Sequence, residues 1–398
     1  MAEKTLFLLD GYALIYRAYF AFINNPRINS SGLNTSAMFG FTNLLLDVIK
    51  KHKPSHIAVV FDPQEEASSR NGYFEAYKAN RQEMPEDLRK SIPYVAQIID
   101  AFRIPLIVEE GYEADDVIGT LAKQAEKRGF TTYMMTSDKD YGQLVTAHTF
   151  WYKPGRMGSP DEVLGVNEVC KKFEVAHPEQ VIDLLGLMGD SSDNIPGIPG
   201  VGPKTAVKLL KEFKTVENLI ENADKLEGKI AEKVKTNTKL ALVSKQLATI
   251  ITDVPVTLDE EALILEEPNY EKLNSLFTEL EFKSLMSRIP ALSQTAQNNG
   301  SQSNVQMVLF GDNEDASPSG LNNIQTIRHQ YFFVNDVNWR KDLCELLLKQ
   351  TDVCIDIETT SLDPMNTEIV GLSFSFKPYQ AFYIPLPNQF EEAASILQ

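Results

Sequence analysis

The hydrophobic pattern of the first 150 residues alternates between short apolar runs and longer amphipathic stretches. The apolar runs are typical of buried strands and cover residues 5–9, 56–61, 105–108 and 132–135. The amphipathic stretches between them have helical spacing and cover residues 37–50, 89–102 and 115–128. Strands that alternate with helices predict an α/β fold with a mostly parallel sheet, covered on both faces.

The pattern changes twice further along the chain. Short helices dominate from about residue 167 to 290, and polar stretches then predict a linker. A new α/β unit follows, with a helix at 337–349 and strands at 353–358 and 369–376. We therefore expect four parts: a catalytic α/β domain (1–170), an all-α helix-hairpin-helix domain (171–290), a flexible linker (291–325) and a partial α/β domain (326–398).

Composition narrows the class of protein. The chain of 398 residues has a net charge of −17, which taken alone argues against a basic nucleic-acid-binding surface. Two segments reverse that sign, because residues 204–214 and 225–245 are rich in lysine; they are either solvated helix faces or a DNA-binding surface. Three cysteines without a CxxC pair, and the absence of a signal peptide or apolar span, favour a reducing cytoplasm.

Acidic residues follow the predicted strands. Asp10, Asp62 and the pair Asp138 and Asp140 each stand at a strand end. In an open parallel sheet these carboxyl ends lie at one edge, where ligands bind. A further acidic group opens a predicted helix: Glu113, Asp115 and Asp116. Ordinary helix capping is the alternative for the last two.

Clustered carboxylates without histidine or cysteine ligands favour hard cations, here Mg²⁺ or Mn²⁺. The sequence has no HExxH, no zinc-type Cys/His spacing and no GxSxG. Two such ions hydrolyse phosphodiesters, since one generates hydroxide and the other stabilises the leaving oxygen. The acids therefore predict a metal-dependent nuclease.

The segment GDSSDNIPGIPGVGPKTA, residues 189–206, combines two chemistries. Asp190 and Asp193 add carboxylates that we expect to reach the metal cluster. The Gly/Pro-rich part is not a P-loop, because Pro203 stands where that motif needs glycine before lysine. Proline suits the first position of a helix, so we expect a helix-hairpin-helix turn that binds a duplex phosphate. Its candidate DNA-binding residues are Gly197, Gly200, Gly202, Lys204 and Thr205.

Residues 70–81, RNGYFEAYKANR, mix aromatic and basic side chains. Aromatic rings stack on bases and cations follow phosphates, which is how single strands are held. Lys78 and Arg81 are three apart and are expected to share a helix face, beside Tyr77. The alternative is an amphipathic surface helix whose aromatic side chains face the core.

Several motifs occur in the order found in the flap endonuclease family, to which the 5′-nuclease domain of bacterial DNA polymerase I belongs. They are LDGYALIYRAYFAF, AVVFD, YKANRQEMPEDLR, GYEADDVIGTLA, TSDKD and GDSSDNIPGIPGVGPKTA. The chain resembles that family over about residues 1–290. The resemblance implies a PIN-like sheet with a helical arch, and places all nine acids named above in the metal site. It also implies that Arg17, Lys78 and Arg81, with Asp116, act in catalysis, and that K⁺ binds the hairpin turn.

The function implied is a 5′-3′ exonuclease and flap endonuclease that acts on DNA and RNA primers in replication and repair. Two alternatives remain, a PIN-type ribonuclease and a non-catalytic DNA-binding module. The resemblance further implies a cytoplasmic, nucleoid-associated monomer.

The third unit carries a second acidic motif. Asp356 and Glu358 are two apart on a predicted strand, and therefore share a face. VCIDIETTSLDP resembles the first motif of the RNase H-like 3′-5′ exonuclease domain that follows the 5′ nuclease in DNA polymerase I. The alternative is two surface acids. That family needs further carboxylates beyond Gln398, so we expect a truncated domain without proofreading or polymerase activity.

One apolar stretch interrupts the linker, QMVLF at Gln306–Phe310. It resembles the peptide that docks into the bacterial sliding clamp. The alternative, that it packs on a neighbouring domain, stays open.

Overall fold

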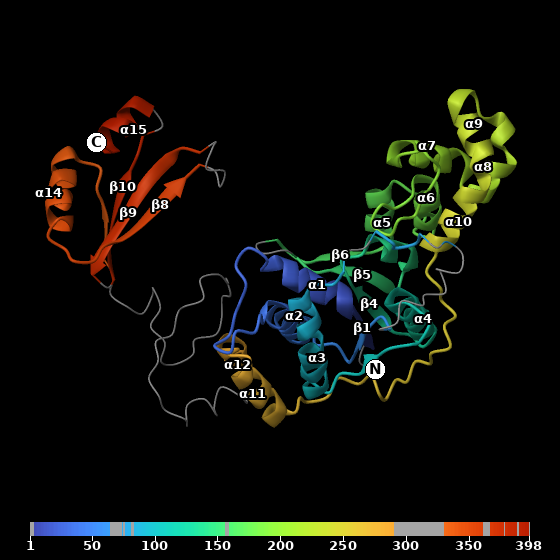
Figure 1. Ribbon diagram of the computed structural model, residues 1–398, viewed down its shortest axis with the longest axis horizontal. Helices are drawn as coiled ribbons and strands as arrows, with labels where there is room; N and C mark the ends of the chain where they lie inside the picture. Colours follow the sequence, from blue (N-terminus) through green and yellow to red (C-terminus); the bar gives the residue numbers. More distant parts are fainter. Residues whose placement is uncertain are drawn as a thin grey trace. The chain divides into compact units, whose positions relative to one another are not determined.

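The computed structural model describes residues 4–63, 74, 76–80, 83–155, 159–289, 330–360, 367–377, 379–387 and 390–397. The chain divides into two compact units, Met1–Gln306 and Met307–Gln398 (Figure 1). Arg81, the polar stretches of the expected linker and Gln306–Phe310 lie outside the described residues. No helix in the described ranges is long and apolar enough to cross a membrane.

The first unit is built on a six-stranded sheet with the order β3-β2-β1-β4-β5-β6. Its strands are β1 (Thr5–Asp10), β2 (His56–Val60), β3 (Leu106–Ile107), β4 (Thr131–Met135), β5 (Thr149–Lys153) and β6 (Glu162–Leu164). All neighbours pair in parallel except β5 and β6. The predicted mostly parallel sheet is confirmed, although β5 and β6 were not among the expected strands.

Helices cover both faces of this sheet, and β1 shows why its sequence is continuously apolar. Phe7 and Leu9 pack with helices α1 (Gly11–Ala21), α2 (Ser36–His52) and α3 (Glu86–Ala101). Leu6 and Leu8 point the other way and pack with α4 (Ala114–Lys127). Each fully buried side chain of this size contributes about 1.5–3 kcal/mol to folding. The alternation of strand side chains thus fills two cores at once.

A helical lobe follows the sheet in the same unit (Figure 1). It contains α5 (Val166–Phe173), α6 (Gln180–Met188), α7 (Pro203–Phe213), α8 (Val216–Glu221), α9 (Gly228–Thr236) and α10 (Thr238–Ala248). A separate apolar core joins them, which includes Leu187, Ile198, Leu210 and Val234. The expected all-α region is present, and the helix-hairpin-helix arrangement, with α6 and α7 as its two helices, stays a proposal.

The chain returns from this lobe along one stripe of α4. Asp116, Thr120, Gln124 and Arg128, each four residues apart, hydrogen-bond the backbone between Ile251 and Leu258. Helices α11 (Tyr270–Glu279) and α12 (Lys283–Met286) then pack on the opposite face, against α3 and Phe39. Side chains of α4 thereby hold an extended segment much as a neighbouring strand would.

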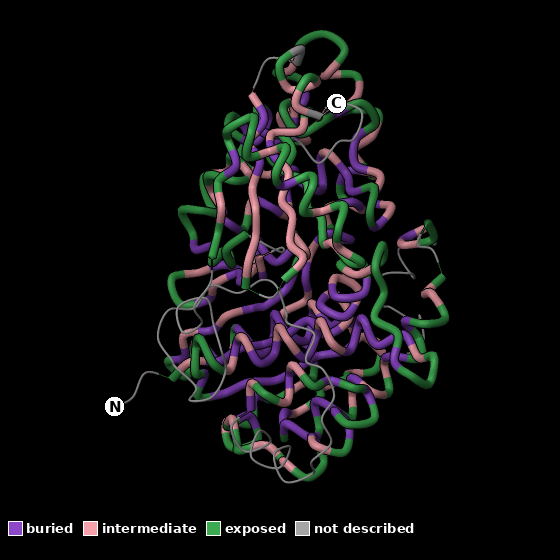
Figure 2. Tube along the Cα trace, turned by 90° about the vertical axis from the view of Figure 1, so that its left-hand side faces the viewer, coloured by how far each residue is buried: buried purple, intermediate pink, exposed green. Residues whose placement is uncertain are grey.

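The second unit has a four-stranded sheet in the order β7-β10-β9-β8. Its elements are β7 (Gln330–Phe333), α14 (Val337–Leu347), β8 (Cys354–Thr359), β9 (Ile369–Lys377), β10 (Gln380–Pro385) and α15 (Phe390–Leu397). Strand β8 lies at an edge and is exposed along its whole length, and Figure 2 shows few buried positions in the chain near the C terminus. The expected α/β unit is present, while its kinship to a particular exonuclease fold stays a proposal.

Candidate active site

Asp10 is the last residue of β1 and caps α1. Its Oδ1 accepts the Ala13 amide at 3.2 Å, and its Oδ2 accepts the hydroxyls of Thr136 at 2.9 Å and Tyr141 at 3.3 Å. Burial, together with the charge of Asp62, raises the pKa of Asp10 to about 7. The carboxylate is therefore held rigidly in a position where a second negative charge is close.

Asp62 follows β2 and connects that strand to α4. Its Oδ1 accepts the backbone amide of Ala114 at 2.8 Å, at the N-terminus of the helix. The partial positive charge of a helix N-terminus favours a carboxylate there. Asp10 and Asp62 thus come together from neighbouring strands, as the strand order requires.

The three acids at the start of α4 have different surroundings. Glu113 accepts the Lys78 ammonium at 2.9 Å and the Tyr77 hydroxyl at 3.2 Å. Asp116 is fully buried, and its two oxygens accept the backbone amides of Glu113 at 3.3 Å and Ile251 at 2.7 Å. Asp116 therefore caps the helix, the alternative considered from the sequence, and also anchors the returning chain. Asp115 lies in the first turn and its charge reaches Tyr141.

Asp138 and Asp140 stand where β4 ends and the short 3₁₀ helix η2 (Lys139–Leu144) begins. Asp138 Oδ1 accepts the Asp140 amide at 3.0 Å. Burial raises the pKa of Asp138, and raises that of Asp140 to about 8 with help from the charges of Asp138 and Asp190. The buried Asp140 Oδ1 has no hydrogen-bond partner in the part of the chain that the structure describes. An oxygen of this kind suits a cation.

Asp190 and Asp193 belong to the turn that follows α6. The backbone groups of Asp190 and Ile195 bond to each other at 2.9 and 2.7 Å, and Ser192 N donates to Asp190 Oδ1 at 2.9 Å. Both acids are at most 9% exposed and add to the rise in the Asp140 pKa. The helical lobe thus brings two carboxylates close to those of the sheet, as expected from the sequence.

Lys78 lies between Glu113 and Asp193. Its Nζ is 2.9 Å from Glu113 Oε2 and 4.0 Å from Asp193 Oδ2, and its amide donates to the Asp193 carbonyl at 3.0 Å. The described residues 76–80 form a turn with Lys78 at a φ of 57°, where the sequence predicted a helix. Arg81 lies outside the described residues, so its shared face with Lys78 stays a prediction. The bond to Asp193 holds this turn.

Tyr77 differs from its expected role in the same segment. The side chain is 5% exposed and packs in the core with α4, below the Lys78 ammonium at 4.9 Å. In this arrangement the ring cannot stack on a base. Its burial agrees with the alternative given above, in which the aromatic side chains of this segment face the core. Arg17 projects from α1 and donates to the carbonyl of Gly155.

Hydrogen bonds hold several of the nine acids in place, and the ammonium groups of Lys78 and Lys139 contact Glu113, Asp193 and Asp190. No group of three or more His, Cys, Asp or Glu side chains forms a ready-made ion site within the described residues. The donor set nevertheless fits a hard divalent cation, because it consists only of carboxylates, several with raised pKa values and one with an unpartnered buried oxygen.

The turn between α6 and α7 needs glycine at two positions. Gly197 has a φ of 61°, and an added Cβ would lie 2.3 Å from the Gly189 nitrogen. Gly200 has a φ of 75°, and its carbonyl accepts Lys233 Nζ from α9 at 3.0 Å. Gly202 caps α7 and Pro203 is its first residue, as predicted. Gly202 and Lys204 are exposed, with Thr205 half-buried, so this face can approach a phosphate.

The sequence patterns did not single out three contributors to the site. Thr136 and Tyr141 hold Asp10, and Lys139 pairs with Asp190 Oδ2 at 2.8 Å. Lys139 had a signal, because it stands between the two acids of TSDKD. Thr136 and Tyr141 had none, since their partner lies far away in the sequence.

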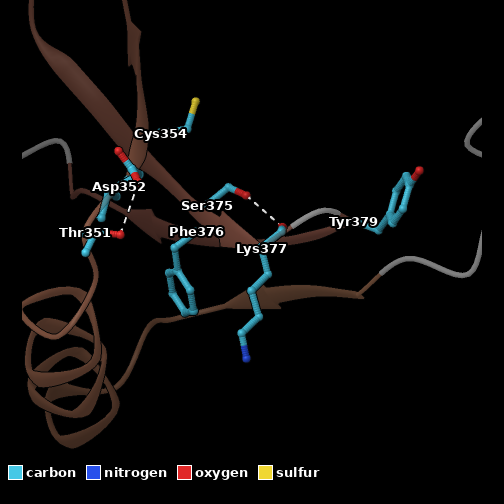
Figure 3. Close-up of a pocket in the computed structure, with 8 residues that line it drawn as sticks. Thr351, Asp352, Cys354, Ser375, Phe376, Lys377 and Tyr379 are labelled. Carbon is cyan, nitrogen blue, oxygen red and sulfur yellow. Dashed lines mark hydrogen bonds between the residues drawn. The ribbon is translucent and has the colours of Figure 1, made fainter. Parts of the chain in front are cut away.

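In the second unit, Asp356 and Glu358 lie on the exposed edge strand β8. A hollow of about 640 Å³ in this unit is lined by Asp352, Ser375, Lys377 and Tyr379 among others (Figure 3). It contains one carboxylate, so it lacks the acidic character of the first unit's site.

Comparison with known proteins agrees with this geometry. Residues 5–174 match the family described as "5'-3' exonuclease, N-terminal resolvase-like domain", and residues 176–271 match "5'-3' exonuclease, C-terminal SAM fold". The 5′-3′ exonuclease of Aquifex aeolicus is 38% identical over 293 residues, which cover 74% of this chain and 98% of that protein. DNA polymerase I of Chloroflexus aurantiacus is 36% identical over 407 residues, covering 98% of this chain and 42% of the polymerase.

A crystal structure of the phage T5 flap endonuclease with DNA and metal ions aligns with a TM-score of 0.53. The alignment covers 70% of this chain and 99% of that one at 19% identity, so it supports the fold. The chain spans less than half the length of the DNA polymerase I relatives that it matches.

The first unit thus combines a resolvase-like sheet, with acids at its strand ends, and a helical lobe that matches the SAM-fold model of 5′-3′ exonucleases. The chain belongs to the 5′-3′ exonuclease family, which includes the N-terminal part of bacterial DNA polymerase I.

Proposed function

We propose that this chain is a metal-dependent, structure-specific 5′ nuclease, which removes 5′ flaps and RNA primers near the junction of single strand and duplex. The observation that carries the proposal is the convergence of buried and half-buried acids from β1, β2, β4, the start of α4 and the turn after α6. The hairpin turn that begins with two of these acids continues into α7, where glycine and lysine residues are exposed. One segment thus joins the cutting site to a surface for duplex DNA.

The residues proposed to hold Mg²⁺ or Mn²⁺ are Asp10, Asp62, Glu113, Asp115, Asp116, Asp138, Asp140, Asp190 and Asp193. When bound, the ions supply hydroxide and stabilise the leaving oxygen. Asp10 and Asp140 have raised pKa values, so at neutral pH they gain most from a nearby cation. Asp116 contributes by holding the amides of Glu113 and Ile251, which fixes the start of α4.

Basic residues of this chain are proposed to position the substrate. Lys78 lies at the acidic cluster on a turn, and its ammonium can transfer from Glu113 to a phosphate oxygen without large backbone movement. Arg17 and Arg81 are proposed to bind phosphate as well, although Arg81 lies outside the described residues. Tyr77 is proposed to support Glu113 through its hydroxyl.

The hairpin is proposed to hold the duplex by its backbone, independent of sequence. Gly202, Lys204 and Thr205 stand at the start of α7, where a helix N-terminus attracts phosphate. Gly197 and Gly200 shape the turn, since both have positive φ angles. A K⁺ ion at the turn remains part of this proposal.

One assay tests the function. A duplex with a 5′-labelled flap is incubated with Mg²⁺ beside a single-stranded RNA, with wild type and Asp140→Asn. We expect Mg²⁺-dependent cleavage of the flap that the substitution abolishes. Preferential cleavage of the RNA would favour a PIN-type ribonuclease, and DNA binding without any cleavage would favour a binding module.

Two further roles are proposed for the remainder of the chain. The strand with Asp356 and Glu358 would belong to a 3′-5′ exonuclease-like unit that does not proofread. Digestion of a recessed 3′ end that Asp356→Ala abolishes would contradict this.

The segment Gln306–Phe310, outside the described residues, would bind a sliding clamp. Unchanged clamp binding by a Leu309→Ala/Phe310→Ala variant would refute that role.

A further inference from the structure

Lys139 is a cation built into the acidic cluster. It stands between Asp138 and Asp140 at the start of η2, and its Nζ lies 2.8 Å from Asp190 Oδ2. The Asp190 side chain is 6% exposed and that of Lys139 is 37% exposed. The ammonium therefore pairs with a buried carboxylate, while part of the lysine side chain stays exposed to solvent.

The pair joins two parts of the first unit. Lys139 belongs to the segment after β4 in the sheet, and Asp190 belongs to the turn after α6 in the helical lobe. The other oxygen of Asp190 accepts the Ser192 amide at 2.9 Å, so the turn itself holds the carboxylate in place. The lysine is the mobile partner, because only its flexible four-carbon stem must move to break the contact.

An ammonium ion and a divalent cation compete for the same carboxylate oxygens. We propose that Lys139 is an internal counter-cation that holds Asp190 in the metal-free protein and leaves it when divalent ions bind. This inference rests on the proposed metal centre. The lysine stabilises the cluster of like charges before the ions arrive, and the same contact lowers the affinity for those ions.

The proposal predicts opposite effects on stability and on metal affinity. Removal of the ammonium should weaken the metal-free fold, because the acids then repel one another without a counter-charge. It should also tighten metal binding, since one competitor is gone and the site is more negative by one unit. A lysine that served only to join sheet and lobe would lower stability without any gain in metal affinity.

A second lysine–aspartate pair provides a matched control. Lys245 Nζ lies 2.6 Å from Asp183 Oδ1, and the Asp183 side chain is 8% exposed. This pair joins α10 to α6 within the helical lobe, and its carboxylate is not among the nine acids of the cluster. Lys245→Met therefore removes this pair, together with the contact of Lys245 to Glu217 at 2.7 Å, away from the proposed metal ligands.

The experiment measures Mn²⁺ binding by calorimetry and thermal unfolding in EDTA, on the full chain. Lys139→Met should lower the unfolding temperature in EDTA and bind Mn²⁺ about tenfold more tightly. Lys139→Gln, which can still donate to Asp190, should keep more of the stability and show the same direction of change in affinity. Lys139→Arg, which keeps the charge, should stay within about threefold of wild type.

The control variants separate the outcomes. Lys245→Met should lower the unfolding temperature and leave Mn²⁺ affinity unchanged. Unchanged or weaker Mn²⁺ binding by both Lys139→Met and Lys139→Gln would overturn the proposal. Asp140→Asn tests the metal centre itself: if it leaves Mn²⁺ binding intact, the proposed centre is wrong, whereas lost binding with no effect at Lys139 refutes only the role of the lysine.

Discussion

Two acidic pairs with the same spacing have different surroundings in this protein. Asp138 and Asp140 follow a central strand, lie among four other segments that carry acids, and have raised pKa values. Asp356 and Glu358 lie on an exposed edge strand, where the structure shows no comparable convergence of acids within the described residues. The comparison teaches that spacing brings two carboxylates to one place, while the strand order and neighbouring segments decide whether a charged site forms.

The largest expected difference between the pairs is in 5′ nuclease activity. Asp140→Asn should lower Mg²⁺-dependent flap cleavage at least about 100-fold, because it removes a proposed metal ligand with an unpartnered oxygen. Asp356→Asn should leave the same activity within about twofold of wild type. Rates under single-turnover conditions check both. Equal losses of flap cleavage in the two variants would show that the two acidic pairs do not differ in their contribution to 5′ nuclease activity.

The next largest effect is expected on the affinity for duplex DNA, which distinguishes DNA binding from cleavage. Gly202→Asp should weaken binding of a nicked duplex about tenfold, since it places a negative charge where a phosphate approaches. The structure offers open space there, and aspartate is a favourable N-cap for α7, so the fold should be kept. Titration of labelled duplex in Ca²⁺ measures the affinity, with Gly202→Ala as the control. Asp140→Asn should bind the duplex as wild type does.

The acids of the first unit should also make the stability of the fold depend on pH. The folded state keeps protons on Asp10 up to a pKa of about 7 and on Asp140 up to about 8, whereas the unfolded chain loses them near 3.8. The folded state thus binds more protons between pH 4 and 8, and the free energy of unfolding falls as pH rises through that range. We expect the protein in EDTA to be less stable at pH 8 than at pH 6 by about 1 kcal/mol or more.

Denaturant unfolding at both pH values measures this difference. Asp140→Asn should raise the free energy of unfolding at pH 8 and reduce its change with pH. An Asp140→Asn variant with the pH dependence of wild type would show that this carboxyl is not the source.

The smallest effect is expected in the second unit. A variant with Asp356→Asn and Glu358→Gln should change the free energy of unfolding by less than about 0.5 kcal/mol, because both side chains are exposed. Thermal unfolding of the full chain, followed with and without Mg²⁺, provides the measurement. A shift of several degrees, or one that Mg²⁺ reverses, would indicate a charged site on β8 after all.

Most of the framework was accessible from local patterns. Apolar runs located β1, β2 and β4 because a buried strand needs unbroken hydrophobic residues on both faces. Pro203 marked the first residue of α7, and the glycines marked the turn before it. Strand β6 was missed, since a three-residue edge strand carries little pattern.

The sequence by itself determined which acids could meet, because parallel strands place their carboxyl ends at one edge of the sheet. Only the tertiary structure decided their partners. Asp116 bonds an amide 135 residues away, and Lys139 rather than another of the many lysines pairs with Asp190. Such contacts depend on the path by which the helical lobe leaves the sheet and returns along α4. Local periodicity contains no information about that path. The sequence therefore identified the charged residues of the site, but it could not predict which of them contact each other.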